Sequence, residues 1–108
     1  AAGVELREID GVTAGFAAND QMAIGVLRAF REVGRDVPED VSIVGFDGLP
    51  DAAQLWPPLT TVQQHPERVG ALAVDALLAE LDGVERQQTP LVATELIVRE
   101  STAAPRKR

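Results

Sequence analysis

Two polar side chains in this sequence follow apolar segments and have the chemistry to bind a small ligand. Asn19 comes after the run 12–18, and Asp47 comes after the run 41–46. An amide side chain both donates and accepts hydrogen bonds, and a carboxylate accepts from two neighbouring hydroxyl groups. The pair suits a polyhydroxylated ligand such as a sugar, or the ring nitrogens of a base. The alternative is structural: Asn19 would cap a helix, and Asp47 would shape a turn with Gly48.

The sequence gives little support for catalysis, metal binding or a cofactor. It has no cysteine and one histidine, which excludes thiolate nucleophiles, Cys-based metal sites and a His-rich metal site. We expect that histidine, His65, in a solvent-facing loop before Pro66. The segment 44–48 is similar to the strand end of haloacid-dehalogenase phosphatases, but Gly45 stands where their nucleophilic aspartate would be. We therefore expect no enzymatic activity, no metal and no cofactor.

Composition places the chain among globular proteins and limits its partners. Its 108 residues are 45% hydrophobic and 25% charged, so they form one domain at most, or part of one. Ten basic and 17 acidic residues give a net charge of −7, which argues against a surface that binds duplex DNA. The basic end 106–108 is interpreted as a solvated tail. With no apolar run of about 18 residues and an acidic start, we expect a cytoplasmic chain without a membrane span or signal peptide.

Apolar spacing predicts alternating strands and helices, and hence a parallel sheet flanked by helices. The predicted strands are 12–18, 41–46, 59–62 and 95–99. The predicted helices are 2–9, one that begins at Asn19 and Asp20 and ends at Gly34, 67–82, and a short turn through Ala53 and Leu55. So small a sheet cannot cover both of its faces, and the chain opens inside a helix. Both features indicate a piece of a larger domain.

Helical spacing also predicts which side chains face the core. On the helix that follows Asn19, the expected core positions are Met22, Ala23, Val26, Leu27, Phe30 and Val33. Trp56 is expected to anchor the short helix from below rather than to stack on a ligand. The tail 103–108 is expected to fray.

Four motifs in order make the sequence similar to one known family. The segments 16–25 (FAANDQMAIG), 37–47 (VPEDVSIVGFD), 57–62 (PPLTTV) and 99–102 (REST) resemble the last third of LacI/GalR-type (lac repressor-type) transcriptional regulators. The resemblance implies an α/β fold, part of a type I periplasmic-binding-protein-like domain with two lobes and an effector between them. Residues 1–108 would then be a C-terminal fragment of this effector-binding and dimerisation domain.

The resemblance assigns each segment to a lobe. It places 14–62 in the C-terminal lobe, the helix 67–82 in a crossing to the N-terminal lobe, the strand 95–99 in the return, and 103–108 in a tail. The implied function is allosteric control of operator binding by a small molecule, such as a sugar or related metabolite. The DNA-binding head of the family is absent from these residues, so operator DNA would be contacted only through that head. The alternative is a periplasmic sugar-binding receptor for transport, and neither reading involves a membrane span.

The resemblance also implies which residues bind the effector and which form a homodimer. Asn19 and Asp47 fall on effector-binding positions, and Gln64 falls at the crossover near the cleft. His65 and Pro66 depart from the family pattern. The helix after Asn19 and the short helix after Asp47 would build the dimer contact, through Ile24, Arg28, Asp51, Gln54 and Leu55. Arg28 and Asp51 would form an ion pair across the dimer.

Overall fold

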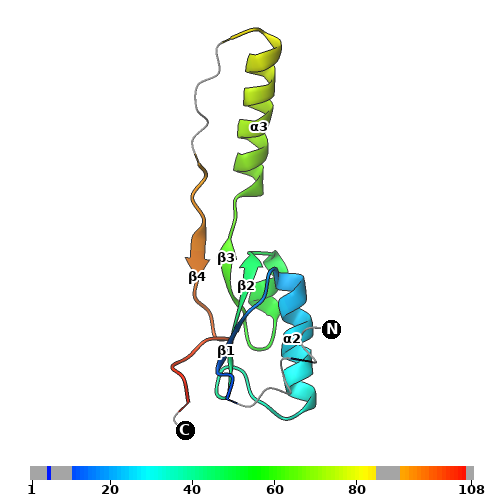
Figure 1. Cartoon of the computed structure of the whole chain (residues 1–108), viewed down its shortest axis with the longest axis vertical. Coiled ribbons are helices and arrows are strands. Elements are labelled where there is room, and N and C mark those ends of the chain that lie inside the picture. The colour runs from blue at the N-terminus through cyan, green and yellow to red at the C-terminus, as the bar shows by residue number, and fades with distance from the viewer. Residues whose placement is uncertain (1–4, 6–10, 85–90, 107–108) are drawn as a thin grey trace. The chain divides into compact units, whose positions relative to one another are not determined.

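The computed structural model describes residues 5, 11–84 and 91–106. Its elements follow the predicted order (Figure 1), and their bounds are β1 Ala14–Phe16, α2 Asp20–Glu32, β2 Ser42–Asp47, the 3-10 helix η1 Pro50–Gln54, β3 Thr60–Gln63, α3 Pro66–Leu81 and β4 Glu95–Ile97. The helix predicted for 2–9 lies outside the described residues, apart from Glu5. Among the described residues, no helix combines the length and the apolar composition that crossing a bilayer requires.

The four strands form one sheet in the order β1-β2-β3-β4. β1 and β2 pair in parallel with Ala14 opposite Ser42, and β2 and β3 pair in parallel with Val44 opposite Thr60. The arrows of β3 and β4 point in opposite directions in Figure 1, because the chain leaves the sheet through β3 and returns through β4. The sheet is therefore mixed, with the predicted parallel arrangement in its first three strands.

The chain divides into two compact units, Ala1–Gln63 with Leu96–Arg108 and Gln64–Glu95. The second unit contains α3, and no residue of that helix is buried. Its large apolar side chains point to several sides, and Leu77 and Leu81 are 60% and 73% exposed. An apolar helix face that is broad and uncovered is typical of a helix that packs against another part of a larger domain.

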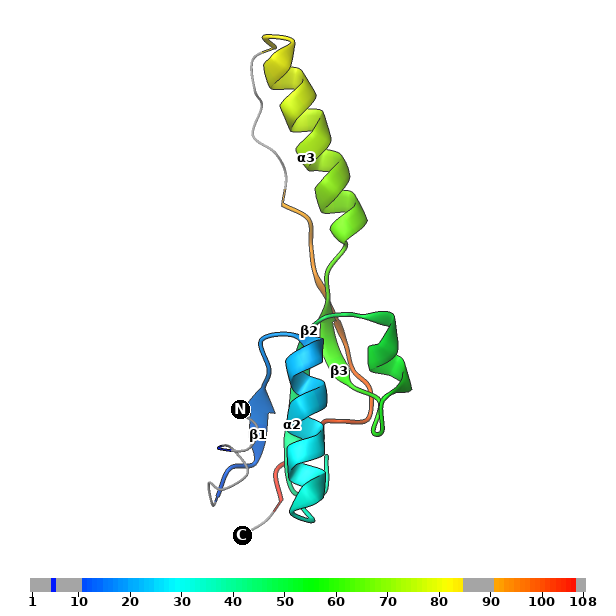
Figure 2. The same cartoon turned by 90° about the vertical axis from the view of Figure 1, so that its right-hand side faces the viewer.

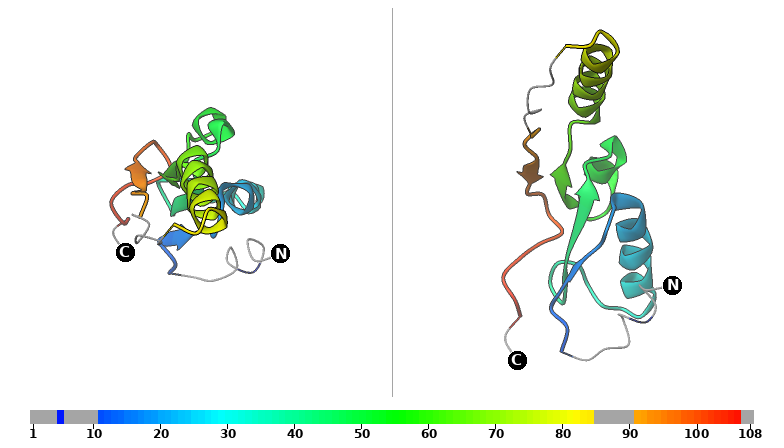
Figure 3. Two further views of the ribbon diagram at one scale, coloured as in Figure 1. Left: turned by 90° about the horizontal axis from the view of Figure 1, so that it is seen from above. Right: turned by 45° about the horizontal axis from the view of Figure 1, so that its top comes forward.

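The core of the first unit lies between α2 and the sheet, and α2 packs against β2 (Figure 2; both views of Figure 3). The largest fully buried apolar side chains there are Phe30, Ile43, Leu59 and Val41. Ala23 is buried as predicted, and Val26 and Leu27 pack against the core. The prediction is wrong for Met22 and Val33, which are 47% and 44% exposed. Both lie at the ends of α2, Met22 in its first turn and Val33 at its C-cap.

Trp56 does not anchor the short helix, because its side chain is 81% exposed. Ala52, on η1, is buried in the core, and Leu55 packs against it. These two smaller side chains occupy the space under the short helix that the indole was expected to fill. The expectation for Trp56 was therefore wrong.

The segment 99–102 forms hydrogen bonds that connect it to β2 and to the start of β3. The buried Ser101 hydroxyl donates to the Ile43 carbonyl oxygen over 2.6 Å and accepts from the Thr60 backbone N–H over 2.8 Å. The Arg99 guanidinium donates to the Leu59 carbonyl oxygen over 2.8 Å. These bonds give a structural reason for the motif that the sequence showed at its end.

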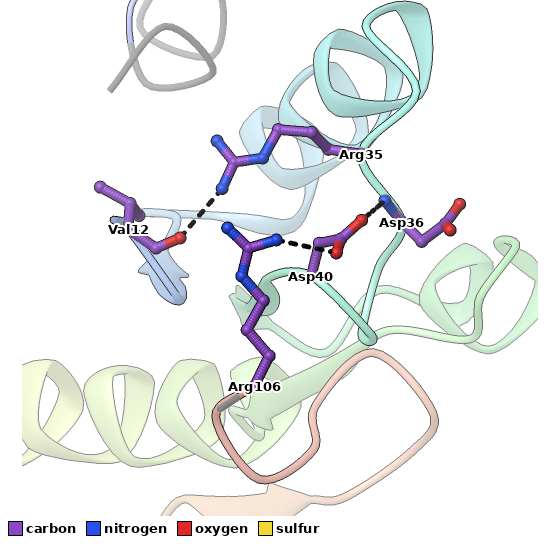
Figure 4. Close-up of polar contacts among 5 residues, drawn as sticks. All are labelled: Val12, Arg35, Asp36, Asp40 and Arg106. Carbon is purple, nitrogen blue, oxygen red and sulfur yellow. Dashed lines mark hydrogen bonds and ion pairs between the residues drawn. The ribbon is translucent and has the colours of Figure 1, made fainter. Parts of the chain in front are cut away.

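The tail after Ser101 does not fray as expected, at least as far as Arg106. The backbone N–H of Ala103 donates to the Ser42 hydroxyl over 3.0 Å. Arg106 pairs with Asp40 over 3.1 Å, beside the bond from Arg35 to the Val12 carbonyl oxygen (Figure 4). The backbone N–H of Asp36, together with the charge of Arg106, holds the pKa of the Asp40 carboxyl below its ordinary value of 3.8. Lys107 and Arg108 lie outside the described residues.

Candidate functional site

Asn19 and Asp47 lie at the same edge of the first unit. β1 and β2 run parallel with Phe16 opposite Val44, so Asn19 follows the carboxyl end of β1 and Asp47 forms the carboxyl end of β2. The backbone N–H of Ala17 donates to the Val44 carbonyl oxygen over 2.8 Å and extends this pairing beyond β1. In open parallel sheets, ligands bind at the carboxyl edge of the strands.

Asn19 caps α2, as the structural alternative predicted, and still has groups to offer a ligand. Its Oδ1 accepts from the backbone N–H of Met22 over 2.8 Å, and that donor fixes which side-chain atom is oxygen. Its side-chain nitrogen donates to no other described residue. The cap therefore occupies an acceptor, and two N–H donors remain at the sheet edge.

Asp47 stands in a conformation that non-glycine residues rarely adopt, with φ at 121°. The next residue, Gly48, has φ at 76°, and a Cβ there would lie 2.7 Å from the Gln63 Cα. A side chain at 48 is thus excluded by the neighbouring main chain as well as by the backbone angle. Strained backbone of this kind gathers at ligand-binding positions, where it persists because the surrounding structure holds it.

A buried carboxylate, Asp20, lies under the loop that carries Asp47. Its side chain is 1% exposed. Its Oδ2 accepts from the backbone N–H of Leu49 over 2.8 Å, and its Oδ1 accepts from the Thr61 hydroxyl over 2.6 Å. The sequence predicted Asp20 only as a residue at a helix start. Acidic residues are common there, so the sequence carried no signal for this wider role.

Gln64 directly follows Gln63, the residue of β3 that pairs with Asp47. It is the first residue of the second unit, whereas Asn19 and Asp47 belong to the first. The neighbouring His65 is the residue before α3, and its Nδ1 lies 3.6 Å from the Glu67 carboxylate. Its side chain is 21% exposed, which is less than expected of a solvent-facing loop.

The predicted dimer residues all belong to the first unit and are accessible there. Ile24 is 42% exposed. Arg28, Asp51 and Gln54 are exposed, and Leu55 is half-buried. Within the chain, Arg28 pairs with Glu32 on the next turn of α2 over 3.2 Å. Any pair between Arg28 and Asp51 of a second copy would replace or share this contact.

A hollow of about 810 Å³ opens at the other end of α2 from Asn19. It is lined by the end of that helix, the turn after it and the Trp56-Pro57-Pro58 run. Trp56 therefore lies away from Asn19 and does not provide a stacking surface beside it. Among the described residues, no cluster of three or more His, Cys, Asp or Glu side chains could hold a metal ion.

The sequence matches a known domain family over almost its whole length. The family described as periplasmic binding protein-like domain matches residues 1–102. The HTH-type transcriptional regulator MalR of Streptomyces coelicolor is 48% identical over 93 residues, which are 85% of this chain and 27% of MalR. The lactose operon repressor of Rhizobium radiobacter is 42% identical over 89 residues, which are 82% of this chain and 79% of that protein. The chain therefore spans about a quarter of MalR and most of the Rhizobium protein.

Solved structures of similar proteins share the fold. The lac repressor dimer bound to operator and the anti-inducer ONPF aligns with a TM-score of 0.87 at 36% identity, over 95% of this chain and 36% of that one. A LacI family regulator from Arthrobacter in complex with lactose aligns with a TM-score of 0.79 at 38% identity, over 95% of this chain and 40% of that one. The regulator CelR in complex with cellobiose aligns with a TM-score of 0.82 at 37% identity, over 92% of this chain and 32% of that one.

These matches confirm both the family and the α/β fold that the four motifs implied. The family match includes the elements that carry Asn19 and Asp47, and the relatives and structures compared are transcriptional regulators. The chain belongs to the periplasmic binding protein-like domain family, in the form found in LacI-type transcriptional regulators.

Proposed function

We propose that this chain is the effector-sensing and dimerisation part of a LacI-type regulator and that its effector is a sugar. The observation that carries the proposal is that the strained Asp47 and the Asn19 side-chain donors, which bond to no described residue, share the carboxyl edge of β1 and β2. In this arrangement, the Asn19 amide donates to a sugar oxygen and the Asp47 carboxylate accepts from hydroxyl groups. Lactose and cellobiose in the similar regulators support a sugar as the ligand class.

We also propose what covers the exposed helix of the second unit. α3 is apolar on several sides and has no buried residue in the structure. We propose that it packs into an N-terminal lobe, with 14–62 in the C-terminal lobe and 95–99 returning to it. Gln64, at the start of the crossover, would then approach the effector from the cleft. If α3 stayed uncovered, each of its large apolar side chains would lack the stabilisation of about 1.5–3 kcal/mol that burial provides.

The proposed mechanism is allosteric, and the chain catalyses no reaction. Effector binding changes the relative arrangement of the lobes and so biases how paired DNA-binding heads meet the operator in the cytoplasm. The chain itself, with its net charge of −7, would not contact the DNA. The alternative of a sugar receptor for transport has no counterpart among the relatives compared above.

Two isosteric substitutions test the effector site by isothermal titration calorimetry with lactose, ribose and cellobiose, on the protein as the cell makes it. Asn19→Asp keeps an oxygen to cap α2 but replaces the donor group by an acceptor. Asp47→Asn keeps the shape and removes the charge, and asparagine tolerates a positive φ. We expect the natural protein to bind at least one of these sugars and each variant to bind it about tenfold more weakly, with an unchanged melting temperature.

Glu39→Gln is the matched control, because this exposed acidic residue lies at the far end of α2 and lines the hollow there. We expect it to leave sugar affinity within about twofold of the natural protein. Equal affinity in the natural protein and in both site variants would show that Asn19 and Asp47 only cap and turn the chain. Absence of binding to all three sugars would remove the proposed ligand class.

We further propose that α2 and η1 form a two-fold dimer contact through Ile24, Arg28, Asp51, Gln54 and Leu55. Ile24 and Arg28 share a stripe of α2 beside its core face, and η1 supplies the other exposed positions. In a two-fold contact, the same patch meets itself on the second copy. An exposed pair between Arg28 and Asp51 of the partner subunit would add only about 0–1 kcal/mol, so the apolar side chains must carry the contact.

Replacing Ile24 by glutamate is expected to shift the protein from dimer to monomer, because two like charges would face each other near the two-fold axis. Sedimentation velocity measures the shift, which we expect to be a loss of at least about tenfold in dimer affinity. Met22→Glu is the control: Met22 is similarly exposed, at 47%, but lies on the opposite side of α2. A dimer that survives Ile24→Glu, or that Met22→Glu disrupts equally, would place the contact elsewhere.

A further inference from the structure

We propose that Asp20 is a positioning residue that holds the loop Asp47–Leu49 in the conformation that presents Asp47 to the ligand. The inference rests on the proposed function of Asp47, and it adds a residue that does not itself touch the ligand. The inference starts from the position of the Asp20 carboxylate, which is buried and connects α2 to the loop after β2 and to β3.

The contacts of Asp20 reach far along the chain. Its Oδ2 accepts from the Leu49 backbone N–H, 29 residues away, over 2.8 Å. Its Oδ1 accepts from the Thr61 hydroxyl, 41 residues away, over 2.6 Å. Thr61 is itself fully buried in β3, so it gives the carboxylate a rigid support. The loop is thereby tied to the sheet two residues after Asp47.

The loop needs such a tie because its backbone is strained. Asp47 has φ at 121° and Gly48 has φ at 76°, and the first of these conformations is unfavourable for an aspartate. Gly48 also packs directly against Gln63. The bond from Leu49 to Asp20 closes the loop on its other side. Released from this bond, the loop would relax toward conformations that turn Asp47 away from its present position.

Packing alone does not explain the carboxylate of Asp20, because burying a carboxylate costs free energy. Both donors that reach it from the described residues are uncharged, and burying a charge with only such partners costs more than burying an apolar side chain of similar size. The N-terminal end of α2 offsets part of that cost through the helix dipole. Its immediate neighbour in sequence, Asn19, is the other proposed ligand residue.

The test compares Asp20→Ala with Asp20→Asn in the protein as the cell makes it. Alanine leaves the Leu49 N–H and the Thr61 hydroxyl without their acceptor. Asparagine can still accept from Leu49 through its oxygen and donate to the Thr61 oxygen, since a hydroxyl also accepts. We expect amide exchange at Leu49, relative to that at Phe30, to rise at least about tenfold in Asp20→Ala and to stay within about threefold in Asp20→Asn.

Ser101→Ala is the matched control. Ser101 is also fully buried and also joins two elements through two hydrogen bonds, but to Ile43 and Thr60 rather than to the loop. We expect both alanine variants to lower the melting temperature, whereas only Asp20→Ala accelerates exchange at Leu49 and weakens sugar binding about tenfold. If Asp20→Ala does not fold, Thr61→Val removes the support of the carboxylate and is expected to give a smaller acceleration at Leu49.

The two readouts separate this inference from the function on which it rests. Equal exchange at Leu49 in the Asp20→Ala and Ser101→Ala proteins would overturn the positioning role, whatever the sugar data show. Faster exchange at Leu49 with unchanged sugar affinity would overturn the link to ligand binding. Failure of the natural protein to bind any of the three sugars would defeat the proposed function, and the exchange at Leu49 would still decide whether Asp20 holds the loop.

Discussion

Replacing Phe30 by alanine is expected to lower the free energy of unfolding of the first unit by about 3–5 kcal/mol. The Phe30 ring is fully buried and is the largest such side chain in the core. It lies between α2 and the sheet, and the Arg35 guanidinium covers it at 5.1 Å from the ring centroid. Alanine would lose the burial of the ring and leave a cavity that the neighbouring strand residues cannot fill.

Chemical denaturation, monitored with a spectroscopic signal from the first unit, measures this change in the free energy of unfolding. Phe16→Ala is the control, since that ring is 66% exposed and its aromatic contact, with Phe46, is 6.4 Å between centroids. We expect the control to cost about 1 kcal/mol or less. Similar losses in the two variants would mean that α2 does not rely on Phe30 to hold it against β2.

Much of the fold was accessible from the sequence because its signals are local. Asn19 and Gly34 mark the ends of α2, and the structure shows the expected cap and a positive φ at the glycine. The apolar run 41–46 became β2 with parallel neighbours on both sides, but only its alternate residues Ile43 and Gly45 are buried, so the strand is not buried on both faces. These features depend on residues a few positions apart, which is the range over which spacing and capping rules apply.

The failures concern side chains whose environment depends on distant segments. Helical spacing predicted Met22 and Val33 in the core, but they lie at the two ends of α2 and are exposed. Trp56 is exposed because Ala52 and Leu55 fill the space under the short helix. The docked tail depends on Ser42 and Asp40, which lie more than 60 residues before it.

The candidate site divides in the same way. Asn19 and Asp47 were predictable, because strand ends of a parallel sheet meet at one edge and both residues have ligand-binding chemistry. Asp20 was not, because nothing in its sequence neighbourhood distinguishes it from other acids that start helices. Its role appears only when Leu49 and Thr61 are folded against it. The residue that organises a site can thus be less visible in a sequence than the residues that contact the ligand.

Gly45 is expected to tolerate no side chain, and Gly45→Ala should lower the free energy of unfolding by about 3 kcal/mol. A Cβ at this position would overlap Asp20 Oδ1 and lie 2.9 Å from Leu59 Cδ2. Overpacking and a disturbed buried hydrogen bond each cost about 1–3 kcal/mol. The control is Gly25→Ala, where a Cβ would meet nothing within 4 Å and helix propensity favours alanine by about 1 kcal/mol.

A double-mutant cycle shows whether the cost at Gly45 arises from the carboxylate. In the Asp20→Ala background, the new methyl group enters space that the carboxylate has left, so only the contact with Leu59 remains. We therefore expect Gly45→Ala to cost at least about 1 kcal/mol less there than in the natural protein. Additive losses would mean that the two residues do not share this space. Coupled losses would explain why a glycine stands where a phosphatase would carry its nucleophile: the position is kept empty for the carboxylate that holds the Asp47 loop.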